Sequence, residues 1–196
     1  MYIISSEPEK IDWDQEPDVD EFRRLFELST GDPRTAAIGF EKLAAKNSIA
    51  SMLHLASGYM QGVPEKSRDK AKYWYSLAAN KGHVGASMVY GRLCLDDKEY
   101  ISAKTAFERV AQLGDPEALY FLGEVHLKGN GDGLDKKSGL ALLNKSSDMG
   151  FPFATRDLAI LMLSGRLGFS NFLKGVPLLF RSAFQLKNLL KSKRKG

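Results

Sequence analysis

Apolar side chains recur every three or four residues through most of the 196-residue chain, which is the spacing of amphipathic α-helices. The pattern begins at Phe22, Leu25 and Leu28, whereas residues 1–18 show no helical period. Glycine or asparagine follows several apolar stretches, and both residues end helices because they tolerate the left-handed backbone conformation. Besides a short helix from Val19 that ends near Gly31, we expect helices over 33–46, 49–61, 70–81, 84–95, 101–113, 116–128, 136–149, 153–163 and 174–191.

One stretch, residues 69–86 (DKAKYWYSLAANKGHVGA), recurs in weaker form four more times along the chain. When the copies are aligned on Gly82, the equivalent positions hold Asn47, Gly114, Gly150 and Leu186. A pattern that recurs in this way predicts stacked helix pairs that share one continuous core. The structural anchors of the repeat are Ala71, Trp74, Tyr75, Ala79, Gly82, Ala86, Gly91, Phe107, Gly114, Ala118, Leu122, Gly123, Gly150 and Ala154.

The first helix of each pair carries a small residue beside two larger ones on the same face. Gly123 follows Leu122 and stands three residues before His126, and Gly91 stands three residues before Cys94. Because a small residue lets a neighbouring helix approach closely, we interpret these positions as packing contacts. His126 and Cys94 are therefore expected to be core residues rather than a metal ligand and a reactive thiol.

The motif A-x3-L-G-x2-Y/H-x2-G, followed by K/S-A-x2-W/A-Y/F and A-A-x2-G, resembles the Sel1-like repeat, a relative of the tetratricopeptide repeat. Residues 70–86 and 118–129 match it best, and the resemblance covers about residues 22–191. Only Trp74 keeps the tryptophan that the family carries in the second helix of a pair. The resemblance implies an all-α protein, a right-handed α/α solenoid of about four to five antiparallel helix pairs, with an adaptor or scaffold function.

In tetratricopeptide geometry, the first helix of each pair (helix A) lines a concave face at fixed offsets from its small residue. On that geometry we expect a peptide or protein partner to bind there. The candidate partner-binding residues are Met60, Met88, Arg92, Tyr120, Glu124, Phe153 and Arg156. The same rule also selects Leu53, Ser57, Gln61, Lys128 and Ile160. Methionine, aromatic residues and arginine are enriched in interface cores, which favours this choice.

Charge is unevenly distributed, although the net charge is only +4. Residues 7–27 hold nine acidic and three basic residues, whereas residues 158–196 hold eight basic residues and no acidic one. The basic run at 187–195 (KNLLKSKRK) suits the C-terminal end of a helix, where cations interact favourably with the dipole. Two alternatives therefore stay open: self-association through the acidic and basic ends, and contact of the basic tail with an anionic membrane or nucleic acid.

A single repeat frame indicates one elongated domain over residues 19–191, preceded by an acidic arm (1–18) and followed by a basic tail (192–196). The content of 43% apolar and 27% charged residues is ordinary for a globular protein. The first residues lack the basic start and apolar stretch of a signal peptide, and the lone Cys94 cannot form an internal disulfide. We therefore expect a cytoplasmic protein.

The sequence offers little for catalysis. His54, His83 and His126 do not stand near cysteine or carboxylate residues at a spacing typical of a metal site. The adjacent Asp96 and Asp97 are expected to close a helix rather than to form a catalytic pair. We expect no catalytic residue, no metal, no cofactor and no small-molecule substrate, so that the chain is not an enzyme.

Overall fold

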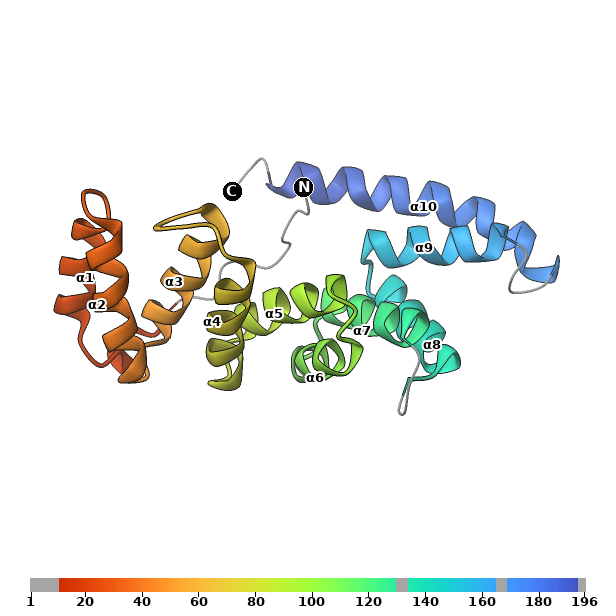
Figure 1. Cartoon of the computed structure of the whole chain (residues 1–196). Helices are drawn as coiled ribbons and strands as arrows, with labels where there is room; N and C mark the ends of the chain where they lie inside the picture. Colours follow the sequence, from red (N-terminus) through yellow and green to blue (C-terminus); the bar gives the residue numbers. More distant parts are fainter. Residues whose placement is uncertain (1–10, 130–133, 165–168, 194–196) are drawn as a thin grey trace. The chain divides into compact units, whose positions relative to one another are not determined.

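The computed structural model describes residues 11–129, 134–164 and 169–193, and over these residues the chain is helical without any strand. A short 3-10 turn (Trp13–Gln15) precedes the helices. The helices are α1 (Val19–Leu28), α2 (Pro33–Ala45), α3 (Ile49–Gln61), α4 (Arg68–Asn80), α5 (Val84–Asp96), α6 (Tyr100–Ala111), α7 (Pro116–Lys128), α8 (Lys136–Asp148), α9 (Pro152–Leu163) and α10 (Phe169–Lys193). The predicted helices 49–61 and 116–128 coincide with α3 and α7 (Figure 1).

Local capping explains where these helices begin and end. The carboxylate of Asp32 accepts a hydrogen bond from the backbone N–H of Thr35 at 3.1 Å, and that of Asp115 accepts one from Ala118 at 2.7 Å. These side chains satisfy backbone donors that the first turn of a helix leaves unpaired. Left-handed residues follow the second helix of four pairs, with φ of +71° at Asn47, +94° at Gly82, +81° at Gly114 and +92° at Gly150.

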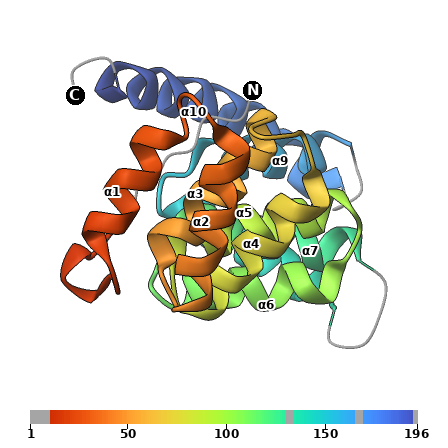
Figure 2. The same cartoon turned by 60° about the vertical axis from the view of Figure 1, so that its left-hand side comes forward.

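The chain divides into two compact units, residues 1–94 and 95–196, which we call unit 1 and unit 2. In unit 1, helices that follow one another in the sequence pack together: α1 on α2, α2 on α3 and α3 on α4 (Figure 2). Their core includes Leu25, Phe40, Leu55 and Tyr59. Trp74 and Tyr75 are partly buried and pack against this core. The repeat anchors Ala71, Trp74, Tyr75, Ala79 and Ala86 thus lie in or against a single hydrophobic cluster.

Within unit 1, the described part of the acidic arm, residues 11–18, contacts α1 and the start of α3. The ring of Trp13 lies 5.4 Å from that of Phe22 in an edge-to-face arrangement. The carboxylate of Glu16 accepts hydrogen bonds from the Ser48 hydroxyl at 2.5 Å and from the backbone N–H of Ala50 at 2.9 Å. Glu16 therefore places a negative charge at the N-terminus of α3, where the helix dipole favours it. Residues 1–10 of the predicted arm lie outside the described residues.

In unit 2 the same sequential packing joins α6 to α7, α7 to α8, α8 to α9 and α9 to α10. Its fully buried side chains include Phe107, Val110, Val125, Leu143 and Leu158. Both views show α10 lying along α9 (Figures 1 and 2). Consecutive helix pairs packed in this order form an α-solenoid.

The last helix corrects one expectation. We predicted that it starts at Lys174, but α10 begins at Phe169 and is 25 residues long. Residues 169–173 (FSNFL) contain neither glycine nor proline, so nothing in them stops a helix. Leu186, at the glycine position of the repeat, lies inside the helix, which continues to Lys193. Of the predicted basic tail, residues 194–196 lie outside the described residues.

Candidate functional site

A candidate binding surface is a groove in unit 2 with a volume of about 590 Å³. Side chains from three helices line it, and we call it the unit 2 groove. The lining residues are Glu124, Leu127 and Lys128 of α7, Lys136, Leu140 and Leu143 of α8, and Asp157, Ile160 and Leu161 of α9. Such a volume and an apolar floor with a few charged groups are typical of ligand and peptide sites in proteins.

The apolar part of the groove remains partly accessible. Ile160 on α9 is 53% exposed, which is unusual for an isoleucine beside four leucines. Leu127, Leu140 and Leu161 are half-buried. Because these side chains keep contact with solvent, a partner that covers them would gain hydrophobic free energy.

Charged side chains of both signs border this apolar surface. Lys128 pairs with Glu124 across one helical turn, with the ammonium nitrogen 2.6 Å from the carboxylate. Arg156 donates a hydrogen bond from Nε to the Asp157 carboxylate at 2.7 Å. Charges at the edge of an apolar surface contribute more to specificity and orientation than to affinity.

Tyr120 is hydrogen-bonded to a residue that lines the groove. It is only 7% exposed, and its hydroxyl donates a hydrogen bond to the Asp157 carboxylate at 2.8 Å. Its ring lies 5.1 Å from that of Phe121 and 5.3 Å from that of Phe151. Burial, together with the negative charges of Glu124 and Asp157, raises the pKa of the Tyr120 phenol. Tyr120 therefore stays protonated and holds α7 against α9.

The structure brings together the candidate residues that we selected in unit 2. Glu124 lines the groove, while Tyr120 and Arg156 both bond to Asp157, which also lines it. The Arg156 guanidinium lies 5.1 Å from the ring centre of Phe153, as in a cation–π contact. These four residues form one cluster on α7 and α9. Tyr120, however, is enclosed by its own neighbours rather than offered to a partner.

The candidate residues of unit 1 have different environments. Met60 on α3 is exposed, Arg92 on α5 is half-buried, and Met88 on α5 is buried with 7% exposure. None of these three is among the described residues that line the unit 2 groove. Met88, like Tyr120, is therefore a buried packing residue and does not offer its side chain to a partner.

The sequence rule missed six of the nine residues that line the groove. It did not select Leu127, Lys136, Leu140, Leu143, Asp157 or Leu161. The rule counted only fixed offsets on helix A, whereas α8 is a second helix of its pair and contributes one whole wall. Leu140 follows Lys136 by one helical turn, and this spacing marks both as neighbours on the same face of α8.

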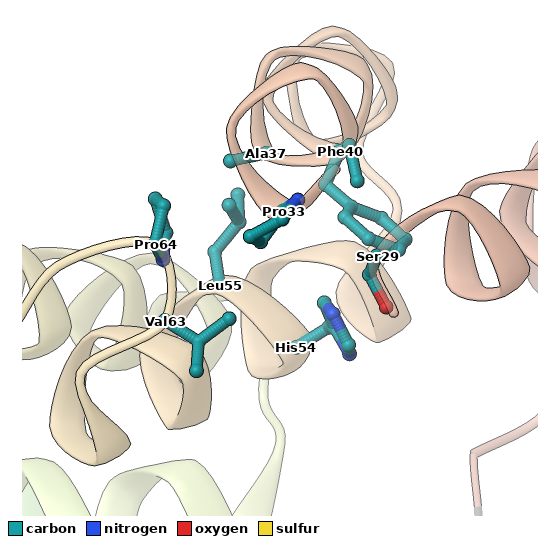
Figure 3. Close-up of a pocket in the computed structure, with 9 residues that line it drawn as sticks. Ser29, Pro33, Ala37, Phe40, His54, Leu55, Val63 and Pro64 are labelled. Atoms are coloured by element: carbon teal, nitrogen blue, oxygen red, sulfur yellow. The ribbon is translucent and has the colours of Figure 1, made fainter. Parts of the chain in front are cut away.

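A second, much smaller cavity of about 20 Å³ lies between α2 and α3 in unit 1. Figure 3 shows His54 and Leu55 of α3 facing Pro33 and Phe40 of α2 across it. The imidazole centre of His54 lies 4.2 Å from the ring centre of Phe40, and burial lowers the pKa of His54. The cavity has room for about one water molecule, so it is not a ligand site.

His126 of α7 and Cys94 of α5 are core residues, as predicted. His126 is buried, and its Nδ1 accepts a hydrogen bond from the backbone N–H of Asp135 at 3.0 Å. Cys94 is fully buried. Within the described ranges, no group of three His, Cys, Asp or Glu side chains is arranged to hold a metal ion. A search of those same ranges found no helix long and apolar enough to cross a membrane.

Comparison with known proteins agrees with the helix-pair architecture. The Sel1 repeat model matches residues 49–83 and 116–151, which are α3 with α4 and α7 with α8. A curated relative, the ERAD-associated E3 ubiquitin-protein ligase component HRD3B of Arabidopsis thaliana, is 36% identical over 93 residues. The aligned region is 46% of this chain but only 15% of that relative.

Solved structures with the same architecture come from several bacteria. A Sel1 repeat protein from Oxalobacter formigenes aligns with a TM-score of 0.67 and 20% identity over 84% of this chain and 51% of its own. The antigen c5321 of uropathogenic Escherichia coli, which displays an SLR fold, aligns with a TM-score of 0.58 and 19% identity. The alignment covers 91% of this chain and 46% of that antigen. MamA from Desulfovibrio magneticus RS-1 aligns with a TM-score of 0.54 and 17% identity, over 90% of this chain and 97% of MamA. At these identities the likeness concerns the fold alone.

The sequential helix pairs, their left-handed connections and these structural neighbours define an α-solenoid repeat protein. More particularly, the chain contains Sel1 repeats at residues 49–83 and 116–151, and its fold is similar to that of solved Sel1 repeat proteins. Proteins of this kind are generally protein-interaction adaptors, and their fold is typically a non-catalytic scaffold.

Proposed function

We propose that this chain is a non-enzymatic adaptor that binds a segment of a protein partner in the unit 2 groove. The observation that carries the proposal is the partly exposed apolar surface of that groove, which includes Ile160 and is accompanied by charged residues of α7, α8 and α9. This arrangement supports binding of a short helix or extended peptide whose apolar side chains enter the groove.

The proposal refines the concave-face prediction. Glu124, Lys128, Arg156 and Ile160 serve as contact residues, while Tyr120 positions Asp157 through its hydrogen bond. Phe153 acts through its contact with Arg156. Met60 and Arg92 belong to unit 1, and whether they contribute to the same partner stays a prediction. A location in the cytoplasm also stays a prediction.

The test compares two isoleucines of unit 2 that are exposed to nearly the same extent. Ile160, at 53% exposure, lines the groove, whereas Ile101, at 58%, lies on α6 and does not line it. A partner is first captured from native extract with the intact chain, and its binding segment is then titrated by calorimetry against Ile160→Asp and Ile101→Asp. We expect Ile160→Asp to weaken binding at least about tenfold, as at an interface hot spot.

Ile101→Asp is expected to leave the affinity unchanged. Equal affinity for both variants would contradict the groove as the binding surface. Recovery of only further copies of the same chain, with a salt-dependent oligomer in size-exclusion chromatography, would instead favour self-association through the acidic and basic ends.

A further inference from the structure

The outer face of α10 exposes a stripe of large apolar side chains. Val176, Phe180 and Phe184 follow one another at four-residue spacing, and they are 46%, 74% and 65% exposed. Side chains at this spacing lie on one side of a helix. We call these three residues the α10 stripe. Two phenylalanines this exposed on one helix face indicate a surface that an apolar environment covers.

The opposite face of α10 is already occupied by α9. A methyl group placed on Gly175 would meet the carbonyl oxygen of Ala159 at 3.0 Å, and Ser182 is buried. The α10 stripe therefore points away from α9. In addition, α10 has 25 residues and α9 has 12, so at 1.5 Å per residue α10 is about 20 Å longer. The stripe is the ridge of a single long helix rather than the floor of a groove.

Basic residues accompany the stripe. Lys187 lies three residues after Phe184 and seven after Phe180, which places it on the same side of the helix, and Lys191 follows one turn later. Lys174 and Arg181 are also exposed on α10, and residues 158–196 contain no acidic residue. Whatever covers this surface must therefore be apolar and negatively charged.

We propose that the α10 stripe binds the surface of an anionic phospholipid membrane. Phenylalanine side chains of an amphipathic helix enter the boundary between headgroups and acyl chains, while neighbouring lysines contact the phosphates. The lysine stems extend along the apolar surface, and their ammonium groups reach the headgroup level. A second α10 helix is excluded as the occupant by charge, because it carries the same basic residues without an acidic residue to pair with them.

The α10 stripe would localise the adaptor to a membrane surface, independently of partner binding in the unit 2 groove. Ile160 and the groove lie on α7, α8 and α9, whereas the stripe lies on α10. The two surfaces can thus be removed separately by substitution.

The test is co-sedimentation of the full chain with two kinds of vesicle. One is phosphatidylcholine alone, and the other contains in addition about a third phosphatidylserine, which gives it a negative surface. We expect binding to the anionic vesicles to be at least about tenfold stronger than to the neutral ones and to weaken at high salt.

Two double variants test the two components of the stripe. Phe180→Ser with Phe184→Ser removes the apolar part, and Lys187→Glu with Lys191→Glu reverses the charge beside it. Each is expected to reduce anionic-vesicle binding at least about fivefold. The control Ile101→Ser, at an apolar residue of α6 that is 58% exposed, is expected to leave binding unchanged. Circular dichroism verifies that the helices persist in all variants.

Three results would overturn the proposal: no binding to anionic vesicles, equal binding to both vesicles, or binding that the phenylalanine variant retains. Salt-sensitive binding to nucleic acid with no vesicle binding would likewise overturn it and assign the basic face to another anionic partner.

Discussion

Gly123 of α7 and Gly139 of α8 face each other so closely that neither position has room for a side chain. A methyl group on Gly123 would meet the carbonyl oxygen of Gly139 at 3.0 Å, and one on Gly139 would meet that of Gly123 at 2.9 Å. Such distances are below ordinary van der Waals contact, and both partners are backbone atoms that cannot move independently. The close approach of α7 and α8 therefore depends on both glycines.

Gly123→Val is expected to destabilise the chain by about 1–3 kcal/mol, because the added carbons force the two helices apart. Urea denaturation followed by circular dichroism measures the loss. Ala141→Val, at an exposed position of α8, introduces the same side chain without the clash and serves as the control. Equal midpoints for the two variants would contradict the glycine contact.

A substitution at Gly82 tests a different property, namely the left-handed backbone conformation that follows α4. Its φ is +94°, and a methyl group built on it meets nothing within 4 Å, so the cost of a side chain there is backbone strain alone. We expect Gly82→Val to lower the free energy of unfolding by at least about 1 kcal/mol. Gly82→Asn should cost less, because Asn47 adopts φ +71° at the equivalent position. If asparagine and valine were equally unfavourable, strain would not be the cause.

The predictions made from sequence succeed where the determinants are local. Asp32, Asp115 and the glycines of the repeat act through backbone groups within a few residues, so they marked the helix ends to within two residues over most of the chain. The burial of Tyr120 depends on Asp157, which is 37 residues away, and on Phe151. The α8 wall of the groove depends in the same way on how three helices pack. Neither feature has a local signal in the sequence.

Glu16 predicts that the N-terminal arm contributes to stability. Its carboxylate accepts hydrogen bonds from Ser48 and Ala50 at the start of α3. We expect Glu16→Ala to cost about 1–3 kcal/mol, because a charged hydrogen bond is lost and the Ser48 and Ala50 donors lose their acceptor. Thermal unfolding measures this loss. Asp14→Ala, an exposed acid two residues earlier, should have little effect, and comparable losses would show that the arm acts only through its net charge.

His54 makes stability depend on pH. Burial lowers its pKa below the usual 6.5, so the unfolded chain binds the proton more readily than the folded chain. Stability is therefore expected to fall as the pH drops below about 6.5, until the lowered pKa of the folded state is reached. Melting temperatures of the wild type and His54→Gln between pH 7.5 and 5.5, above the range of ordinary carboxylates, test this prediction. An identical pH dependence in both proteins would show that His54 is not responsible.

The central claim, that a protein partner occupies the unit 2 groove, is tested most directly by photo-crosslinking. Benzoylphenylalanine is introduced in place of Ile160 in one protein and in place of Ile101 in another, and each is irradiated in native extract. We predict a partner crosslinked at position 160 and absent at position 101, with its attachment site mapped to one short segment by mass spectrometry. A partner crosslinked at position 101 but not at position 160 would contradict the claim.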